Sequence, residues 1–149
     1  MERIAKNELP KLVKMVLEKL PAKEERPGRA ALITLQGDLG AGKTTFVQEL
    51  ARTLGVGEAV VSPTYVLMKS YDLTSQPFKK LVHIDAYRLA GAQEFAALEP
   101  ASFLLDEDAL VCIEWPERIE GALPKPDLEL KLSSEDAKEG ERYFSINPE

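Results

Sequence analysis

The chain has 149 residues, 44% of them hydrophobic and 30% charged, which is typical of a globular protein, and we expect one domain spanning residues 1–149. It contains no apolar run of roughly 18 residues and no signal-like apolar segment at its N-terminus, so we expect a cytoplasmic protein with no membrane partner. A formal net charge of -6 argues against a broad basic face that would bind nucleic acid, so we expect no DNA partner. If RNA is involved, we expect a partner protein to make most of the contacts with it.

An amphipathic helix is predicted near the N-terminus. Apolar residues recur at helical spacing between residues 9 and 20, Asn7 is a plausible N-cap, and Pro10 is tolerated in the first turn. Residues 23–29 are charged and include a proline and a glycine, which predicts a solvated loop leading into a central strand.

Residues 37–44, GDLGAGKT, match the phosphate-binding pattern G-x-x-x-x-G-K-[ST]. The run before them, residues 30–35, is short and largely aliphatic, as in a strand buried on both faces of a parallel sheet. After them, apolar residues recur at helical spacing up to Leu54, and Gly55 is placed to end the helix. The pattern therefore predicts a strand, a glycine loop and a helix.

This arrangement favours nucleotide binding over a glycine-rich turn that binds nothing. Main-chain N–H groups of such a loop point inward, and the start of the following helix adds partial positive charge. Lys43 is expected to contact the β and γ phosphates, and the Thr44 hydroxyl to bind Mg²⁺. The predicted nucleotide-binding residues of the loop are Asp38, Leu39, Gly40, Ala41, Gly42, Lys43, Thr44 and Thr45.

Residues 60–68 contain a Ser-Pro-Thr segment with two possible roles. Pro63 favours extended backbone at Ser62, which suits a turn that opens a strand. Alternatively, the hydroxyls of Ser62 and Thr64 border the γ-phosphate, as switch segments do in other P-loop proteins. Position alone does not decide between them.

Two predicted strands end in carboxylates. Residues 65–71 and 79–85 form a probable hairpin, which makes Asp85 a candidate for orienting water or assisting Mg²⁺. Residues 109–114 form a more uniformly apolar strand, so Glu114 is the better candidate for the acid that acts with Mg²⁺. His83, the only histidine, is expected to be a hydrogen-bonded packing residue rather than a catalytic one.

The remaining segments complete the predicted architecture. Residues 89–105 predict one or two short helices broken near Gly91 and Pro100, and Cys112 is expected to be a buried filler. A short helix is predicted from Pro116 through Ile119 and Leu123. Residues 128–132 and 142–146 predict a second hairpin.

Four motifs in series carry a resemblance to a known family. Gly-Asp-Leu-Gly-Ala-Gly-Lys-Thr, Ser-Pro-Thr-Tyr, His-Ile-Asp-Ala-Tyr-Arg and Glu-Trp-Pro-Glu resemble, in order and spacing, the TsaE (YjeE) ATPases of bacterial tRNA threonylcarbamoyladenosine (t6A) biosynthesis. The resemblance covers roughly residues 30 to 146.

The resemblance implies an α/β fold like that of P-loop NTPases, with three α/β/α layers, a mixed central sheet and antiparallel hairpins. It also implies ATP and Mg²⁺ as cofactors, weak hydrolysis by the protein alone, and assembly with the TsaB and TsaD proteins, with tRNA reached only through that complex. Lys43 would contact the phosphates, and Thr44 with Glu114 would bind Mg²⁺. Asp85 would lie near the γ-phosphate or the metal, and Ser62 with Thr64 in the switch segment.

Two rivals to an ATPase coupled to a protein assembly stay open at this point. A small-molecule kinase would need a lid with several arginines, and residues 89–105 contain none. A nucleotide-gated binding module, in which ATP only stabilises an interface, would use the same carboxylates without turnover.

Overall fold

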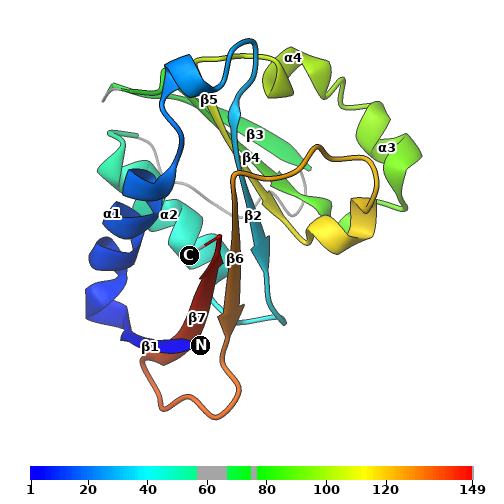
Figure 1. The fold of residues 1–149 in the computed structure, drawn as a ribbon. Helices are drawn as coiled ribbons and strands as arrows, with labels where there is room; N and C mark the ends of the chain where they lie inside the picture. The colour runs from blue at the N-terminus through cyan, green and yellow to red at the C-terminus, as the bar shows by residue number, and fades with distance from the viewer. Residues whose placement is uncertain (57–66, 75–76, 149) are drawn as a thin grey trace.

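Seven strands form one sheet in the computed structural model, which describes residues 1–56, 67–74 and 77–148 (Figure 1). The order across the sheet is β1-β7-β6-β2-β5-β4-β3. The strands are β1 Glu2–Ala5, β2 Ala31–Gln36, β3 Met68–Asp72, β4 Lys80–Asp85, β5 Ala109–Glu114, β6 Leu128–Ser133 and β7 Glu141–Asn147.

Four α-helices and four short 3₁₀ helices connect the strands in the same described ranges. The α-helices are α1 Leu9–Lys19, α2 Lys43–Thr53, α3 Ala92–Ala96 and α4 Ala101–Leu104. The 3₁₀ helices are η1 Lys6–Glu8, η2 Lys23–Glu25, η3 Ala86–Arg88 and η4 Pro116–Ile119. None of the helices in this part of the chain has the length and apolarity that crossing a lipid bilayer requires.

The sheet is mixed, as predicted. β6, β2, β5 and β4 are mutually parallel, and the hairpins β3–β4 and β6–β7 add antiparallel strands on either side. β1 pairs antiparallel with β7 at one edge. Both predicted hairpins are therefore confirmed, together with the α/β fold class.

Central strands β2 and β5 are buried on both faces, which explains their uniformly apolar sequences. Ile33 and Leu35 pack into a cluster with residues of α1 and α2, whereas Leu32 packs with α3, α4 and η4 on the other face. Figure 1 shows these two groups of helices on opposite sides of the sheet. The fold consequently has three layers.

The strand register gathers three carboxyl ends at one edge. Glu114, the last residue of β5, is paired with Leu35 of β2 on one side and with Asp85 of β4 on the other. In open α/β sheets, ligands bind in the crevice outside these strand ends. The glycine loop that follows β2 therefore lies next to both predicted acids.

The charged segment 23–29 differs from the predicted solvated loop. Arg26 is only 1% exposed; its Nε donates to Pro21 O at 3.1 Å, and its Nη1 donates to Arg29 O at 2.9 Å and Glu107 O at 3.2 Å. The guanidinium carbon also lies 5.3 Å from the ring centroid of Phe78. A buried arginine is tolerated here because backbone carbonyls replace its lost hydration.

The N-terminus also departs from expectation in two places. Strand β1 was not predicted, because it has four residues and only Ile4 among them is buried. Asn7 is not the N-cap of α1: it lies inside η1, and Glu8 occupies the cap position without a side-chain cap bond. The predicted helix itself and Pro10 in its first turn are confirmed.

Further along the chain, the other helix predictions are mostly confirmed. Short helices α3 and α4 follow Gly91 and Pro100, as expected. Pro116 does begin a helix, but η4 ends at Ile119 and does not reach Leu123.

Candidate functional site

Gly37 sets the course of the glycine loop as it leaves β2. A Cβ atom at this position would lie 2.4 Å from the backbone oxygen of Leu132 in β6, far inside van der Waals contact. Its φ of 153° is also one that side chains rarely adopt. The motif therefore requires glycine here, because the loop passes directly against the neighbouring strand.

Gly42 begins the helix that follows. It is the N-cap of α2, with φ 103° in the left-handed region, and it has no side chain to occupy the cap position. The amides of the first turn of a helix have no intrahelical acceptor, and the helix dipole makes this end partially positive. The start of α2 is therefore suited to an anion.

Lys43 lies between this loop and an aromatic ring. Its Nζ donates to Gly37 O and, at 2.9 Å, to Asp38 O, and it lies 4.3 Å from the ring centroid of Trp115. The side chain is almost fully buried, and burial lowers the pKa of Lys43, while the charge of Glu114 acts in the opposite direction. A poorly hydrated ammonium group next to loop amides is well suited to bind phosphate oxygens.

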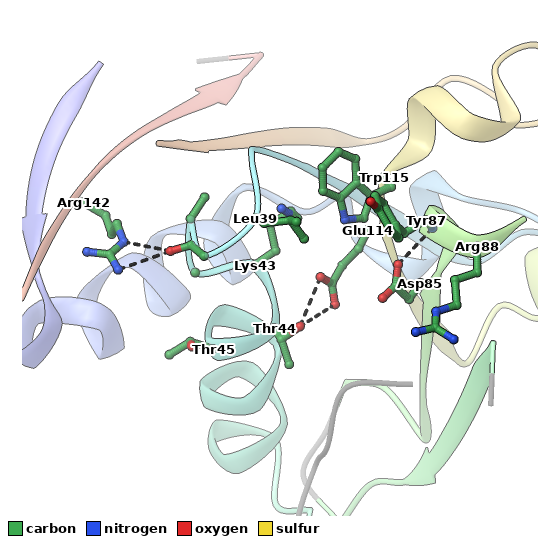
Figure 2. Close-up of a pocket in the computed structure, with 13 residues that line it drawn as sticks. Leu39, Lys43, Thr44, Thr45, Asp85, Tyr87, Arg88, Glu114, Trp115 and Arg142 are labelled. Carbon is green, nitrogen blue, oxygen red and sulfur yellow. Dashed lines mark hydrogen bonds between the residues drawn. The ribbon is translucent and has the colours of Figure 1, made fainter. Parts of the chain in front are cut away.

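Trp115 takes its position from an unusual backbone conformation. Its φ is 60°, in the left-handed region, and its N–H donates to Leu35 O at 3.1 Å. The indole ring packs against the ring of Tyr87 with 4.9 Å between centroids. This bend immediately after Glu114 brings the indole over Lys43, as Figure 2 shows.

Glu114 connects β5 to the start of α2. Its Oε1 and Oε2 lie 3.2 and 3.1 Å from Thr44 Oγ1, whose hydroxyl donates to the carboxylate (Figure 2). The carboxylate is 3% exposed, and its Oε2 is also 2.5 Å from Nε2 of His83. His83 is fully buried, so the prediction of a hydrogen-bonded packing residue is confirmed, with a site carboxylate as its partner.

Asp85 lies beside Glu114 at the end of β4. Its Oδ1 accepts a hydrogen bond from the N–H of Tyr87 at 3.0 Å (Figure 2). Burial raises the pKa of Asp85, the amide bond from Tyr87 opposes that rise, and the charge of Glu114 adds to it. The carboxylate is thus fixed in direction and more basic than an ordinary aspartate.

These groups surround a cavity of about 420 Å³. Its lining brings together most of the residues that the sequence predicted, from the loop and from both strand ends. The lining residues are Leu39, Gly40, Ala41, Gly42, Lys43, Thr44, Thr45, Asp85, Tyr87, Arg88, Glu114, Trp115 and Arg142. Asp38 is not among them but accepts from Lys43, and Ser62 and Thr64 lie outside the described residues.

Arg142 is a site residue that the sequence reasoning missed. It lies on β7, and its Nε and Nη2 donate to Gly40 O of the glycine loop at 3.3 and 3.2 Å (Figure 2). The two residues are 102 positions apart, and no sequence pattern connects them. A second cavity of about 470 Å³ lies next to Arg142. It shares Ala41, Gly42, Thr45 and Arg142 with the first cavity.

The donor set suits a magnesium ion that is bound together with a ligand. Within the described residues, no group of three or more His, Cys, Asp and Glu side chains could hold a metal ion unaided. Mg²⁺ usually takes only one or two protein carboxylates and completes its shell with substrate phosphates and water. A hydroxyl from Thr44 and a carboxylate from Glu114 beside this cavity match that requirement.

Known proteins resemble this chain in sequence. A family model described as "Threonylcarbamoyl adenosine biosynthesis protein TsaE" matches residues 5–144. The tRNA threonylcarbamoyladenosine biosynthesis protein TsaE of Bacillus subtilis is 35% identical over 135 residues, which are 85% of this chain and 80% of the relative. The proteins of the same name from Borreliella burgdorferi and Synechocystis are 37% and 43% identical, over 65% and 59% of this chain and 68% and 55% of theirs.

A solved structure resembles it in fold. The crystal structure of Bacillus subtilis YdiB superposes with a TM-score of 0.65 and 25% sequence identity, over 97% of this chain and 82% of the other. The family model covers nearly the whole sequence and agrees with the relatives. The chain therefore belongs to the TsaE family of threonylcarbamoyl adenosine biosynthesis proteins.

Proposed function

We propose that this protein is a Mg²⁺-dependent ATPase that acts as the accessory component of tRNA t6A modification, together with TsaB and TsaD. The observation that carries the proposal is the cavity in which Lys43, the glycine loop and the Thr44–Glu114 pair meet. Family membership supports the pathway, and the chemistry of the cavity supports the nucleotide.

The triphosphate lies along the loop in this proposal. The amides at the start of α2 and the ammonium group of Lys43 bind the β and γ phosphates, whose negative charge needs neutralising before phosphoryl transfer. Thr44 and Glu114 hold Mg²⁺, which neutralises the charge that develops on the phosphate oxygens. Asp85, held by the Tyr87 amide, orients the attacking water.

The nucleoside occupies the second cavity. That cavity begins where the phosphate cavity ends, since both include Ala41, Gly42 and Thr45, and it continues between β1, α1 and the β6–β7 hairpin. Apolar side chains of Ile4, Leu9 and Leu132 line it, as expected for a site that packs against a base.

Partners complete the catalytic site in this proposal. Phosphoryl transfer reaches full rate when an arginine from a second protein neutralises the transition state, a contribution of about 10³ to 10⁵ in rate. A net charge of -6 disfavours direct tRNA binding, so tRNA is reached through TsaB and TsaD. Hydrolysis by the protein alone should consequently be slow.

Binding can be tested with the protein's own fluorescence. Trp115 is the only tryptophan and lies in the cavity, so its emission should change on addition of Mg·ATP. Lys43→Ala should abolish the change. An unchanged emission together with the absence of heat in calorimetry would refute the proposal.

Turnover needs a separate test, because a gating module would also bind ATP. Asp85→Ala should keep binding Mg·ATP but lose hydrolysis, both alone and with TsaB and TsaD, and tRNA modification should fail. If modification survived the loss of hydrolysis, ATP would act as a gate instead. If the protein alone hydrolysed ATP as fast as its mixture with TsaB and TsaD, the proposed coupling of hydrolysis to the assembly would be wrong.

A further inference from the structure

The buried contact between His83 and Glu114 has a geometry that packing alone does not require. In the parallel register, His83 is opposite Cys112, and Glu114 is opposite Asp85, so the imidazole reaches diagonally along one face of the sheet. Its Nε2 lies 2.5 Å from Glu114 Oε2, and His83 and Glu114 are 0% and 3% exposed. A hydrogen bond this short between groups this buried restricts both side chains.

The contact also favours one tautomer of the imidazole. A neutral imidazole has one N–H and one lone-pair nitrogen. If Nε2 were the lone-pair nitrogen, it would face a carboxylate oxygen at 2.5 Å with no hydrogen between them. Beside an ionised Glu114, Nε2–H is therefore the donor, while Nδ1 has no hydrogen-bond partner among the described residues.

Glu114 needs this second donor because Thr44 can supply only one proton. The Thr44 hydroxyl lies within 3.2 Å of both carboxylate oxygens but can donate to one of them at a time. His83 contacts Oε2 from β4, whereas Thr44 contacts the carboxylate from α2. The two donors together fix the plane of the carboxylate, and the Thr44 oxygen keeps its lone pairs for a cation.

We propose that His83 is a positioning residue that holds the Glu114 carboxylate in its cation-binding orientation before nucleotide and Mg²⁺ arrive. The proposal rests on the function proposed above and deepens it. Partners of metal ligands that do not themselves touch the metal act in this way in other metalloproteins, where their loss typically costs about 10- to 100-fold in metal affinity. His83 is accordingly expected to affect the cation more than the nucleotide.

The first test uses the wild-type protein, because His83 is the only histidine in the sequence. A chain labelled with ¹⁵N-histidine and carrying no affinity tag gives NMR signals from this ring alone. The expected spectrum shows a protonated Nε2, slow to exchange with solvent, and an unprotonated Nδ1. A ring protonated only at Nδ1 would overturn the proposal, as would a spectrum that Glu114→Gln leaves unchanged.

The second test compares two substitutions at the same position. His83→Gln places an amide N–H near the original Nε2, whereas His83→Phe keeps the ring volume and removes the donor. The readout is the apparent Kd for Mn²⁺, from the electron paramagnetic resonance of free Mn²⁺, with the protein saturated by a non-hydrolysable ATP analogue. We expect His83→Phe to weaken Mn²⁺ binding by about 10- to 100-fold and His83→Gln to restore most of it.

Controls separate this role from stability and from the proposed function. Ile84→Val, a buried change on the opposite face of the same strand, should leave Mn²⁺ affinity unchanged. If His83→Gln and His83→Phe lost Mn²⁺ affinity equally, the role of His83 would be structural and the proposal would be wrong. If His83→Phe bound Mn²⁺ as tightly as wild type, His83 would serve only in packing, which would also overturn the proposal. Failure of the wild type to bind the ATP analogue would instead overturn the proposed function.

Discussion

Burial and hydrogen bonding shift the pKa of Asp85 in opposite directions. Burial raises its pKa, the Tyr87 amide lowers it, and the neighbouring Glu114 raises it further, with a net upward shift. The folded protein therefore holds the Asp85 proton more tightly than the unfolded chain does. Stability from this group is present below the ordinary aspartate pKa, about 3.9, and is lost as the pH rises through the raised value.

Asp85→Asn should consequently stabilise the protein at neutral pH. The amide oxygen can still accept from Tyr87, and the cost of a partly buried charge disappears. The measurement is the free energy of unfolding against pH: the variant should exceed wild type near pH 7 and converge with it toward pH 3. An exposed aspartate, Asp72→Asn on β3, is the control and should change stability little. A less stable variant at neutral pH would contradict the argument.

Gly37 offers a second test at the scale of one residue. Gly37→Ala would place a Cβ 2.4 Å from Leu132 O, whereas Gly28→Ala, also at positive φ, would meet no atom within 4 Å. Both variants strain the backbone by about 1–2 kcal/mol. Because of the overlap, the free energy of unfolding of Gly37→Ala should be lower than that of Gly28→Ala by about 1–3 kcal/mol, as measured by urea unfolding. Equal losses would show that the loop does not press against β6.

At the scale of elements, the C-terminal hairpin supports the glycine loop. Arg142 of β7 donates twice to Gly40 O, which fixes one peptide of the loop at the margin shared by the two cavities. A fixed loop loses less conformational entropy when it binds a ligand. If the loop binds a nucleotide as proposed, the hairpin should contribute to that affinity from the far end of the sequence.

Arg142→Ala should weaken ATP binding by about 2- to 10-fold, which corresponds to a loss of about 0.5–1.5 kcal/mol of hydrogen bonding. Binding is followed through Trp115 fluorescence, and unfolding midpoints show whether the fold is kept. Arg3→Ala is a matched control, since the Arg3 side chain forms its ion pair with Glu141 of the same hairpin. If both variants bound ATP like wild type, the support from Arg142 would be negligible.

At the scale of the whole molecule, the sequence predicted the features that depend on consecutive residues. The glycine loop, its strand and its helix are consecutive, so the centre of the site followed from one pattern. Parallel strands buried on both faces have largely apolar sequences, which is why Asp85 and Glu114 could be recognised at the ends of theirs.

The remaining features depend on contacts between distant segments. Arg142 reaches the loop only because the strand order places β6 beside β2 and β7 beside β6. Arg26 is buried by carbonyls that the fold brings around it, and strand β1 exists only as the partner of β7. The contact between His83 and Glu114 likewise depends on the pairing of β4 with β5, which composition does not reveal.

The most direct measurement is a crystal structure of the protein with Mg²⁺ and a non-hydrolysable ATP analogue. Phosphates should follow the amides of residues 40–45 with Lys43 on their oxygens, and the cation should contact Thr44 Oγ1 on the side facing Glu114. Phosphates bound elsewhere, or a cation distant from both Thr44 and Glu114, would contradict the account.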